Sequence, residues 1–174
     1  TVVFLQGCPL RCIWCHNPES QSARPILGHH KEQCIQCQTC TRIAPDLLSS
    51  TETGIRLNHL TYHHPTSLID RCPANALQPS AALQAAQAVF QIVLQDTDYY
   101  HSSGGGLTVS GGEPLFQPDF TCVLLQLSKA HEIHTCLETS GHASSKRFNS
   151  FIPLTDLFLF DYKATDPNLH KKLT

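Results

Sequence analysis

Short apolar runs alternate with amphipathic stretches along much of this chain. Four apolar runs, each followed by a polar or glycine-rich segment, have the character of buried strands; they are residues 2–5, 107–109, 133–137 and 157–160. Between them, apolar side chains recur at helical spacing, as at Leu83, Ala86, Phe90 and Val93. The pattern therefore predicts helices that alternate with strands.

The helices expected between these strands have recognisable ends. Ser80 is a suitable N-cap for a helix over residues 81–95, and the glycines at 104–106 would end that helical region. Further helices are expected over 119–129 and 144–151. Strands that alternate with helices form βα units around a parallel sheet. The expected fold class is therefore α/β.

Residues 21–80 do not follow this alternation. They are polar, contain no long periodic element, and hold five prolines and four further cysteines. We interpret this stretch as an inserted small metal domain. The predicted organisation is a first strand and cluster loop at 1–20, an insert at 21–80, and the remaining βα units at 81–174.

Composition narrows the class of protein. The chain has 174 residues, enough for a substantial core, and a net charge of −2, which gives no basic surplus for nucleic-acid binding. It contains neither a signal-peptide pattern at its first residues nor an apolar run that would span a bilayer, so we expect no membrane partner. The nine cysteines lie mostly in clusters, which favours metal binding in a reducing cytoplasm over disulfides.

Three of the cysteines directly follow the first predicted strand. Cys8, Cys12 and Cys15 are separated by three and then two residues. Structural zinc sites usually take four ligands in paired sets, whereas clustered thiolates also suit an iron–sulfur cluster. In a 4Fe–4S cluster three thiolates would leave one iron open to bind a substrate. A zinc knuckle is the alternative for the same residues.

The other predicted strands also end in chemically useful residues. They are followed by Gly111, Gly112 and Glu113, by Glu138 and Thr139, and by Asp161 and Lys163. In β/α folds the carboxyl ends of the strands build the active site, so these residues and the three cysteines are expected to lie together. Each motif also has a purely structural interpretation. The two glycines would form a tight turn, the Glu138–Thr139 motif would supply a helix cap, and Asp161 and Lys163 would form a salt bridge.

The segment Gly-Cys-Pro-Leu-Arg-Cys-Ile-Trp-Cys-His-Asn-Pro-Glu-Ser resembles the signature of the radical S-adenosylmethionine superfamily. The branch it resembles is the glycyl-radical-enzyme activating enzymes, typified by pyruvate formate-lyase activating enzyme. The resemblance implies a partial (β/α) barrel of about four βα units, truncated at both ends. We expect such a stretch to be poorly soluble and to show little activating turnover by itself.

The same resemblance implies a role for each motif. Cys8, Cys12 and Cys15 would hold the 4Fe–4S cluster with one open iron. The other implied roles concern the cofactor: Trp14 beside the adenine; Gly111, Gly112 and Glu113 at the methionine amine; Glu138 and Thr139 near a monovalent cation at the carboxylate; and Asp161 and Lys163 at the ribose and carboxylate.

The insert resembles bacterial ferredoxins. Cys34, Cys37 and Cys40 have the ferredoxin spacing, and Cys72 precedes a proline, as the last cysteine of a second ferredoxin motif does. Ala44 stands where a further ligand is expected. Because ferredoxin motifs ligate crosswise, these four cysteines are expected to hold one auxiliary 4Fe–4S cluster. A four-cysteine zinc site, or an insert that binds nothing, are the alternatives.

The implied function is radical chemistry on a protein partner. S-Adenosylmethionine would be cleaved reductively to a 5′-deoxyadenosyl radical, which abstracts hydrogen from a backbone glycine of a glycyl-radical enzyme. A flavodoxin or ferredoxin-type reductant would supply the electron. One alternative is another radical S-adenosylmethionine maturase or modifying enzyme. An alternative of another class is a non-catalytic iron–sulfur or zinc module for electron transfer or binding.

The remaining histidines and cysteines are expected to have no functional role. The pairs His29–His30 and His63–His64 lie in polar segments and are expected to be solvated, with no ligand role. Cys122 falls on a predicted helix and Cys136 in a predicted strand, where each is expected to pack as a small apolar residue.

Overall fold

The chain folds as two compact units. We call residues Thr1–Ala23 with Leu83–Thr174 the sheet unit, and residues Arg24–Ala82 the insert unit. The computed structural model describes residues 1–52, 54–57 and 66–174, so the pair His63–His64 lies outside the described residues. Each unit has its own hydrophobic core.

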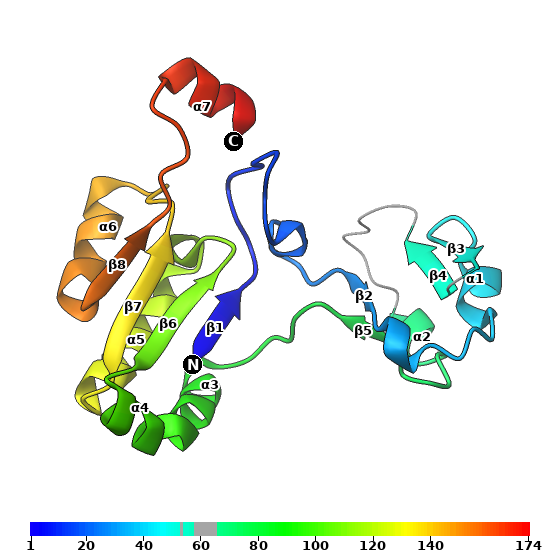
Figure 1. Ribbon diagram of the computed structural model, residues 1–174, viewed down its shortest axis with the longest axis horizontal. Helices are drawn as coiled ribbons and strands as arrows, with labels where there is room; N and C mark the ends of the chain where they lie inside the picture. The colour runs from blue at the N-terminus through cyan, green and yellow to red at the C-terminus, as the bar shows by residue number, and fades with distance from the viewer. Residues whose placement is uncertain (53, 58–65) are drawn as a thin grey trace. The chain divides into compact units, whose positions relative to one another are not determined.

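A four-stranded parallel sheet forms the centre of the sheet unit (Figure 1). Its strands lie in chain order and are β1 (Val2–Leu5), β6 (Gly106–Gly111), β7 (His134–Thr139) and β8 (Leu157–Phe160). Each neighbouring pair is parallel. The prediction of an α/β fold with a parallel sheet is confirmed, and the four predicted strands are all present.

Helices connect these strands. The α-helices are α3 (Ala86–Val93), α4 (Thr97–Ser103), α5 (Pro118–Ala130), α6 (Ser145–Phe151) and α7 (Pro167–Leu173). Short 3₁₀ turns are η1 (Pro18–Ser20), η3 (Leu94–Asp96), η4 (Pro114–Phe116) and η5 (Ile152–Leu154). Local signals set several ends: Pro118 is at the first position of α5, and the Ser144 hydroxyl accepts the Arg147 N–H to cap α6.

The helix expected over residues 81–95 begins later than predicted. The Ser80 hydroxyl caps no helix; it accepts the backbone N–H of Ile26 at 3.0 Å, a partner far away in sequence. Helix α3 begins at Ala86 and continues through η3 into α4. Gly104 ends α4 in the left-handed conformation, at φ 69°, as expected from the run of glycines.

One face of the sheet carries the core. The strand register aligns Val3, Val109, Leu137 and Phe158 across the sheet. These side chains pack with residues of α3, α5 and α6, including Phe90, Leu124 and Phe151. The two cysteines outside the motifs pack as predicted: Cys122 packs against this core, and Cys136 is buried on the opposite face of β7, in register with Thr108 and Leu157.

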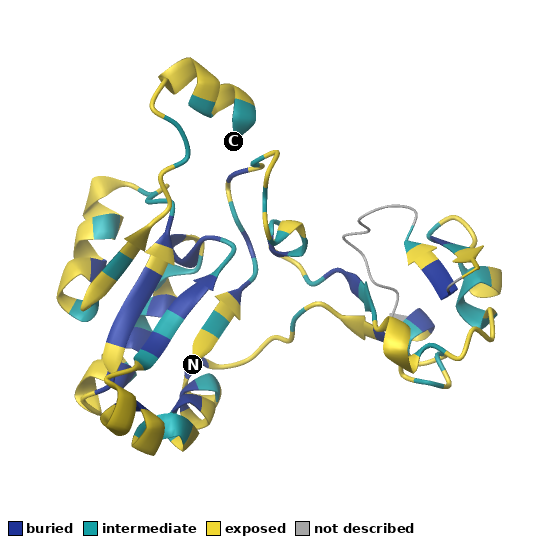
Figure 2. Cartoon of the chain, viewed as in Figure 1, coloured by how far each residue is buried: buried dark blue, intermediate teal, exposed yellow. Residues whose placement is uncertain are grey.

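The opposite face of the sheet is more open. Val2 and Phe4 of β1 are 51% and 62% exposed, and Leu157 and Leu159 of β8 are each 46% exposed. Figure 2 shows a related difference between strands: β7 is largely buried and β8 is largely exposed. β1 and β8 are the edge strands of the sheet.

The insert unit contains short elements only. β2 (Leu27–His29) pairs antiparallel with β5 (Leu77–Pro79), and β3 (Leu48–Thr51) pairs antiparallel with β4 (Gly54–Leu57). The helices are α1 (Thr39–Ile43) and α2 (Thr66–Ile69), with a 3₁₀ turn η2 at Lys31–Gln33. Its core consists of Leu27, Leu48, Ile55, Leu68 and Leu77.

Within the described residues, no helix combines the length and the apolar character needed to cross a bilayer.

Candidate functional site

The carboxyl ends of the four parallel strands surround one cavity of about 350 Å³, which we call the strand-end cavity. Its volume lies within the range of small-molecule sites in proteins. All the residues expected at the radical cluster and its cofactor line it: Cys8, Cys12, Trp14, Cys15, Gly111, Gly112, Glu113, Glu138, Thr139, Asp161 and Lys163. The topology of the sheet explains this grouping, because parallel strands present their carboxyl ends at one edge.

The loops after β1 and β6 meet backbone to backbone. The Gly112 N–H donates to Leu5 O, and the Glu113 N–H donates to Gly7 O, each at 2.8 Å. A Cβ on Gly112 would lie 2.3 Å from Gly7 O, so no side chain fits at this position. Gly7 itself has φ 96°, a conformation that favours glycine, and it turns the chain into the three-cysteine loop.

The three-cysteine loop is held mainly by backbone contacts. The Cys15 N–H donates to Cys12 O at 3.1 Å, and the Arg11 guanidinium donates to Cys8 O at 2.7 Å. Burial raises the pKa of the Cys8 thiol, and the charge of Glu113 raises it further, against a hydrogen bond from the Leu10 backbone. Binding of a metal at Cys8 would therefore have to displace a tightly held proton.

Glu113 is buried, and its carboxylate is surrounded by donors. Oε1 accepts from the Thr139 hydroxyl at 2.6 Å and from the Leu115 N–H at 3.1 Å. Oε2 accepts from the N–H and the hydroxyl of Ser140, at 2.9 and 2.6 Å. A carboxylate accepts about four hydrogen bonds. Glu113 therefore joins the loop after β6 to the end of β7. The hydrogen-bonding capacity of its carboxylate is already used by these four donors.

Three other charged side chains line the cavity, those of Glu138, Asp161 and Lys163. Glu138 accepts a hydrogen bond from the Ser110 hydroxyl at 2.6 Å. Lys163 forms an ion pair with Asp161, just after β8. Burial lowers the pKa of Lys163, but the hydrogen bond and charge of Asp161, together with Cys12 and Cys15, raise it above its ordinary value. Lys163 is thus a retained cation at the edge of the cavity.

The donor set fits a thiolate-bound cluster and a zwitterionic ligand. Three thiols lie in one loop, both signs of charge are present, and Gly111 and Gly112 line the same cavity. Trp14 is 47% exposed and lines the cavity, so a flat aromatic surface is available beside it.

Several lining residues were not anticipated from the sequence. Ser110 and Ser140 hold the acidic side chains, and Asn17 and Gln21 line the cavity from the loop after β1. The position of Ser140, directly after the Glu-Thr pair, was the available signal. Asp166, slightly downstream of Lys163, does not line the cavity. Its carboxylate accepts the Leu169 N–H at 2.7 Å and caps α7.

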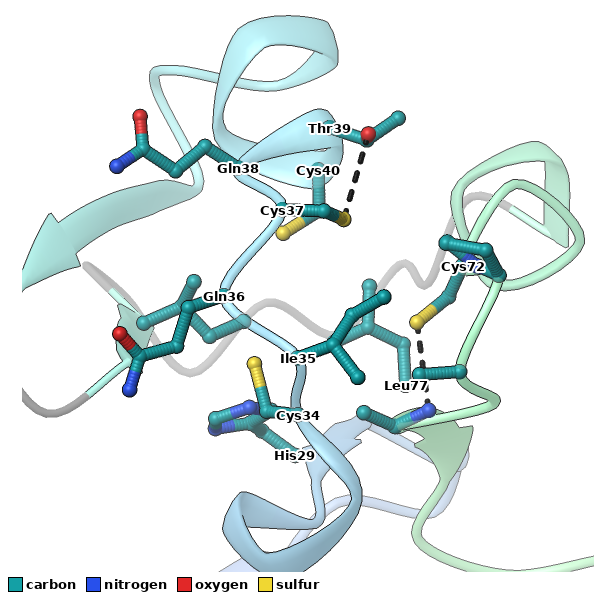
Figure 3. Close-up of a pocket in the computed structure, with 14 residues that line it drawn as sticks. His29, Cys34, Ile35, Gln36, Cys37, Gln38, Thr39, Cys40, Cys72 and Leu77 are labelled. Atoms are coloured by element: carbon teal, nitrogen blue, oxygen red, sulfur yellow. Dashed lines mark hydrogen bonds between the residues drawn. The ribbon is translucent and has the colours of Figure 1, made fainter.

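A second pocket lies within the insert unit and is lined by Cys34, Cys37, Cys40 and Cys72, and we call it the cysteine pocket. Figure 3 shows the four cysteines around this pocket, with Ile35 drawn between the sulfur atoms of Cys34 and Cys72. The Cys72 sulfur accepts the Ala76 N–H at 3.3 Å, and the Cys37 sulfur lies 3.4 Å from the Thr39 hydroxyl. Hydrogen bonds from Thr39 lower the pKa of Cys37.

The backbone of this cysteine loop is unusual. Gln36 and Gln38 both have positive φ, at 55° and 59°, which a residue with a side chain rarely adopts. Successive turns of this kind direct backbone N–H groups toward one side, as in many anion and iron–sulfur sites. The spacing of the three cysteines is therefore accompanied by a loop shape suited to a cluster.

Neither set of thiols is arranged as a site for a single metal ion. Among the described residues, no three His, Cys, Asp or Glu side chains converge as such an ion requires. A mononuclear zinc draws its sulfur ligands to about 2.3 Å from one centre. A 4Fe–4S cluster binds each thiolate at a different iron, and this spreads the ligands further apart.

His29 is the histidine that departs from the expectation of solvated imidazoles. It lines the cysteine pocket, and its Nε2 is buried. The position of His29 in the sequence, five residues before Cys34, did not by itself indicate a buried imidazole.

The fold and cavity together define a class of protein: a β/α domain whose strand ends form one cofactor cavity beside a three-cysteine loop. No protein-family profile matches the chain. Individual relatives do match it along its length. The (2S)-3-sulfopropanediol dehydratase activating enzyme of Klebsiella oxytoca is 37% identical over 180 residues, covering 100% of this chain and 57% of the relative.

Two further relatives extend the comparison. The trans-4-hydroxy-L-proline dehydratase activating enzyme of Clostridioides difficile is 35% identical over 100% of this chain and 58% of its own length. The benzylsuccinate synthase activating enzyme of Thauera aromatica is 33% identical over 98% of this chain and 54% of its own length. The chain thus spans less than two thirds of these relatives. It is a homologue of the glycyl-radical-enzyme activating enzymes, which confirms the resemblance seen in its motifs.

Proposed function

We propose that this chain carries the cluster and S-adenosylmethionine site of a glycyl-radical-enzyme activating enzyme. The observation that carries the proposal is the strand-end cavity, which gathers the three-cysteine loop and every strand-end motif around one space. Homology to activating enzymes along the whole chain supports it. We further infer that the four-stranded sheet is part of a β/α barrel.

In this proposal the chain's residues position and enclose the ligand. Cys8, Cys12 and Cys15 hold a 4Fe–4S cluster with one open iron. When bound, this cluster supplies the electron for reductive cleavage of S-adenosylmethionine, and the radical released takes a hydrogen atom from a glycine of the partner enzyme. We assign the methionine end of the cofactor to the backbone at Gly111 and Gly112, because both glycines line the cavity.

The charged residues complete the proposed cofactor site. Lys163, held by Asp161, is placed to bind the methionine carboxylate, and Trp14 offers its ring to the adenine. We assign Glu138 and Thr139 to the surroundings of a monovalent cation, although Thr139 already donates to Glu113. We assign Glu113 to holding the two loops together, and the methionine amine to the neighbouring backbone.

The insert unit is proposed to be ferredoxin-like and to hold one auxiliary 4Fe–4S cluster through Cys34, Cys37, Cys40 and Cys72. The shared pocket and the left-handed loop residues support this assignment. A flavodoxin or ferredoxin-type protein would deliver electrons, in the reducing cytoplasm where such clusters persist. The partner would be a glycyl-radical enzyme, for which the dehydratases activated by the relatives are the first candidates.

Anaerobic reconstitution tests the proposal directly. The chain is loaded with iron and sulfide, reduced, and supplied with S-adenosylmethionine, and 5′-deoxyadenosine is quantified. We expect about eight irons per chain and cleavage of the cofactor, and about four irons with no cleavage after Cys12→Ala. Cys122→Ala is the matched control, because Cys122 lies in the sheet unit away from both pockets, and it should retain iron and cleavage.

The partner is tested by electron paramagnetic resonance. A glycyl radical that appears on a co-incubated dehydratase supports activation. Cleavage of S-adenosylmethionine without a radical on any glycyl-radical enzyme favours a maturase or modifying enzyme. Zinc in place of iron at both pockets would contradict the radical function and favour a binding module.

A further inference from the structure

His29 has a buried nitrogen with no partner. It ends β2 and lines the cysteine pocket together with the four thiols. Across the described part of the chain, its Nε2 is the one buried side-chain nitrogen or oxygen that forms no hydrogen bond. Leaving such an atom unsatisfied costs about 1–3 kcal/mol. A group bound in the pocket that accepted a hydrogen bond from Nε2 would offset this cost.

The surrounding backbone fixes the position of His29 at the end of β2. In the β2–β5 register His29 lies opposite Leu77, and the next N–H, that of His30, donates to Ala76 O at 2.8 Å. Ala76 in turn donates its own N–H to the Cys72 sulfur. His29 is therefore tied to the segment that presents one of the four thiols. On another side, a Cβ added to Gly54 would lie 3.7 Å from His29 Cε1.

The surroundings of His29 favour the neutral imidazole over the cation. Burial lowers the pKa of His29, and the nearby Lys31 and His30 lower it further. A neutral imidazole carries one N–H, and Nε2–H is a donor when the proton lies on that nitrogen. Four cysteines already supply one thiolate to each iron of a 4Fe–4S cluster, which leaves no position for a nitrogen ligand.

We propose that His29 donates a hydrogen bond from Nε2 to a sulfur of the auxiliary cluster held by Cys34, Cys37, Cys40 and Cys72, and thereby raises the reduction potential of that cluster. Reduction adds negative charge to the cluster, and a hydrogen-bond donor to sulfur stabilises that charge. His29 is thus a positioning and tuning residue and binds no iron. This inference rests on the auxiliary cluster proposed above.

The test uses the full chain with Cys12→Ala, so that the auxiliary cluster is the one observed. Redox titration followed by electron paramagnetic resonance compares His29→Phe, His29→Gln and His30→Phe in this background. We expect His29→Phe to lower the reduction potential. His29→Gln, which keeps an N–H donor, should restore much of the shift, and His30→Phe, at an exposed position, should leave the potential unchanged.

Nitrogen hyperfine spectroscopy of the reduced cluster provides a readout that does not depend on a variant's stability. A weak ¹⁴N coupling in the Cys12→Ala chain, absent from His29→Phe, supports the hydrogen bond. A strong coupling, typical of an imidazole bound to iron, overturns it, as does an unchanged potential in His29→Phe. If the Cys12→Ala chain binds zinc or no iron at all, the auxiliary cluster itself is refuted, and this inference with it.

Discussion

The buried carboxylate of Glu113 links the loop after β6 to Thr139 and Ser140 at the end of β7. Its place after a strand end predicted a ligand-facing carboxylate, whereas the side chain accepts hydrogen bonds from Leu115, Thr139 and Ser140. Two of these partners come from the loop after the next strand. Their identity depends on the register between β6 and β7, which no local sequence pattern encodes.

Glu113→Gln should destabilise the sheet unit. The amide would place an NH₂ group against donors that now face a carboxylate, and leave at least one of them unsatisfied while buried, at about 1–3 kcal/mol. Urea denaturation of the metal-free chain measures the effect. Glu132→Gln, at an exposed position, is the control and should change stability by less than about 0.5 kcal/mol. Equal stabilities for the two variants would contradict the role given to Glu113.

Gln38→Gly should stabilise the insert unit. A side chain in the left-handed conformation costs about 1 kcal/mol, and glycine relieves this at φ 59°. We expect a gain of up to about 1 kcal/mol. The same change at Gln33, in the 3₁₀ turn η2, should lower stability. Glycine loses more conformational entropy on folding, and at this position no backbone strain is relieved in return. Amide exchange at β2 and β5 in the metal-free chain separates the two outcomes, and a loss at both positions would refute the argument.

At the scale of elements, the period of the apolar residues was sufficient to predict the four parallel strands and α5. It failed where partners are distant in sequence. Ser80 has the composition of an N-cap but accepts a hydrogen bond from Ile26, so the helix starts at Ala86. The elements of the insert unit were also missed, because strands of three or four residues are too short to establish a period.

Asp156 ties α5 to the start of β8. Its carboxylate accepts from Lys129, at the end of α5, and from the N–H and hydroxyl of Thr135 in β7. The hydrogen bond from Lys129 is the main cause that lowers the pKa of Asp156 from 3.8 to about 2. Since the pKa is depressed by folding, the contribution to stability is complete above pH 3.8 and is lost as the pH falls through about 2.

Asp156→Asn should therefore lower the free energy of unfolding at neutral pH by about 1 kcal/mol, a value reduced for solvent screening of a partly exposed pair. The difference between the original chain and the variant should shrink between pH 4 and pH 2. Thermal unfolding across this pH range measures it. A double-mutant cycle with Lys129→Ala isolates the ion pair, and a difference that stays constant with pH would contradict the assignment.

At the scale of the whole molecule, the open face of the sheet is the surface most prone to association with other chains. Leu157 and Leu159 are exposed on an edge strand, and Val2 and Phe4 are exposed on the opposite edge. Edge strands with apolar side chains pair readily with other chains. The expectation that this stretch is poorly soluble by itself stays a prediction.

Leu159→Lys should increase the monomer fraction measured by sedimentation velocity at equal protein concentration. The lysine stem covers the apolar surface while its charge opposes strand pairing, and folding stability should change by less than about 1 kcal/mol. Leu137→Lys is the matched control: Leu137 is 0% exposed in the core, so this variant should fail to fold. Unchanged association of Leu159→Lys would show that the edge of β8 is not the surface that associates.

The contact between the loops after β1 and β6 restricts where this chain can accept additional sequence. Gly7 and Gly112 meet without an intervening side chain, so an insertion in either loop would separate the cysteines from the rest of the cavity. The insert unit instead departs after Ala23 and returns at Leu83, beyond this junction. Modules of different size could therefore be exchanged at those two points, during evolution or by grafting, without disturbing the chemistry at the strand ends.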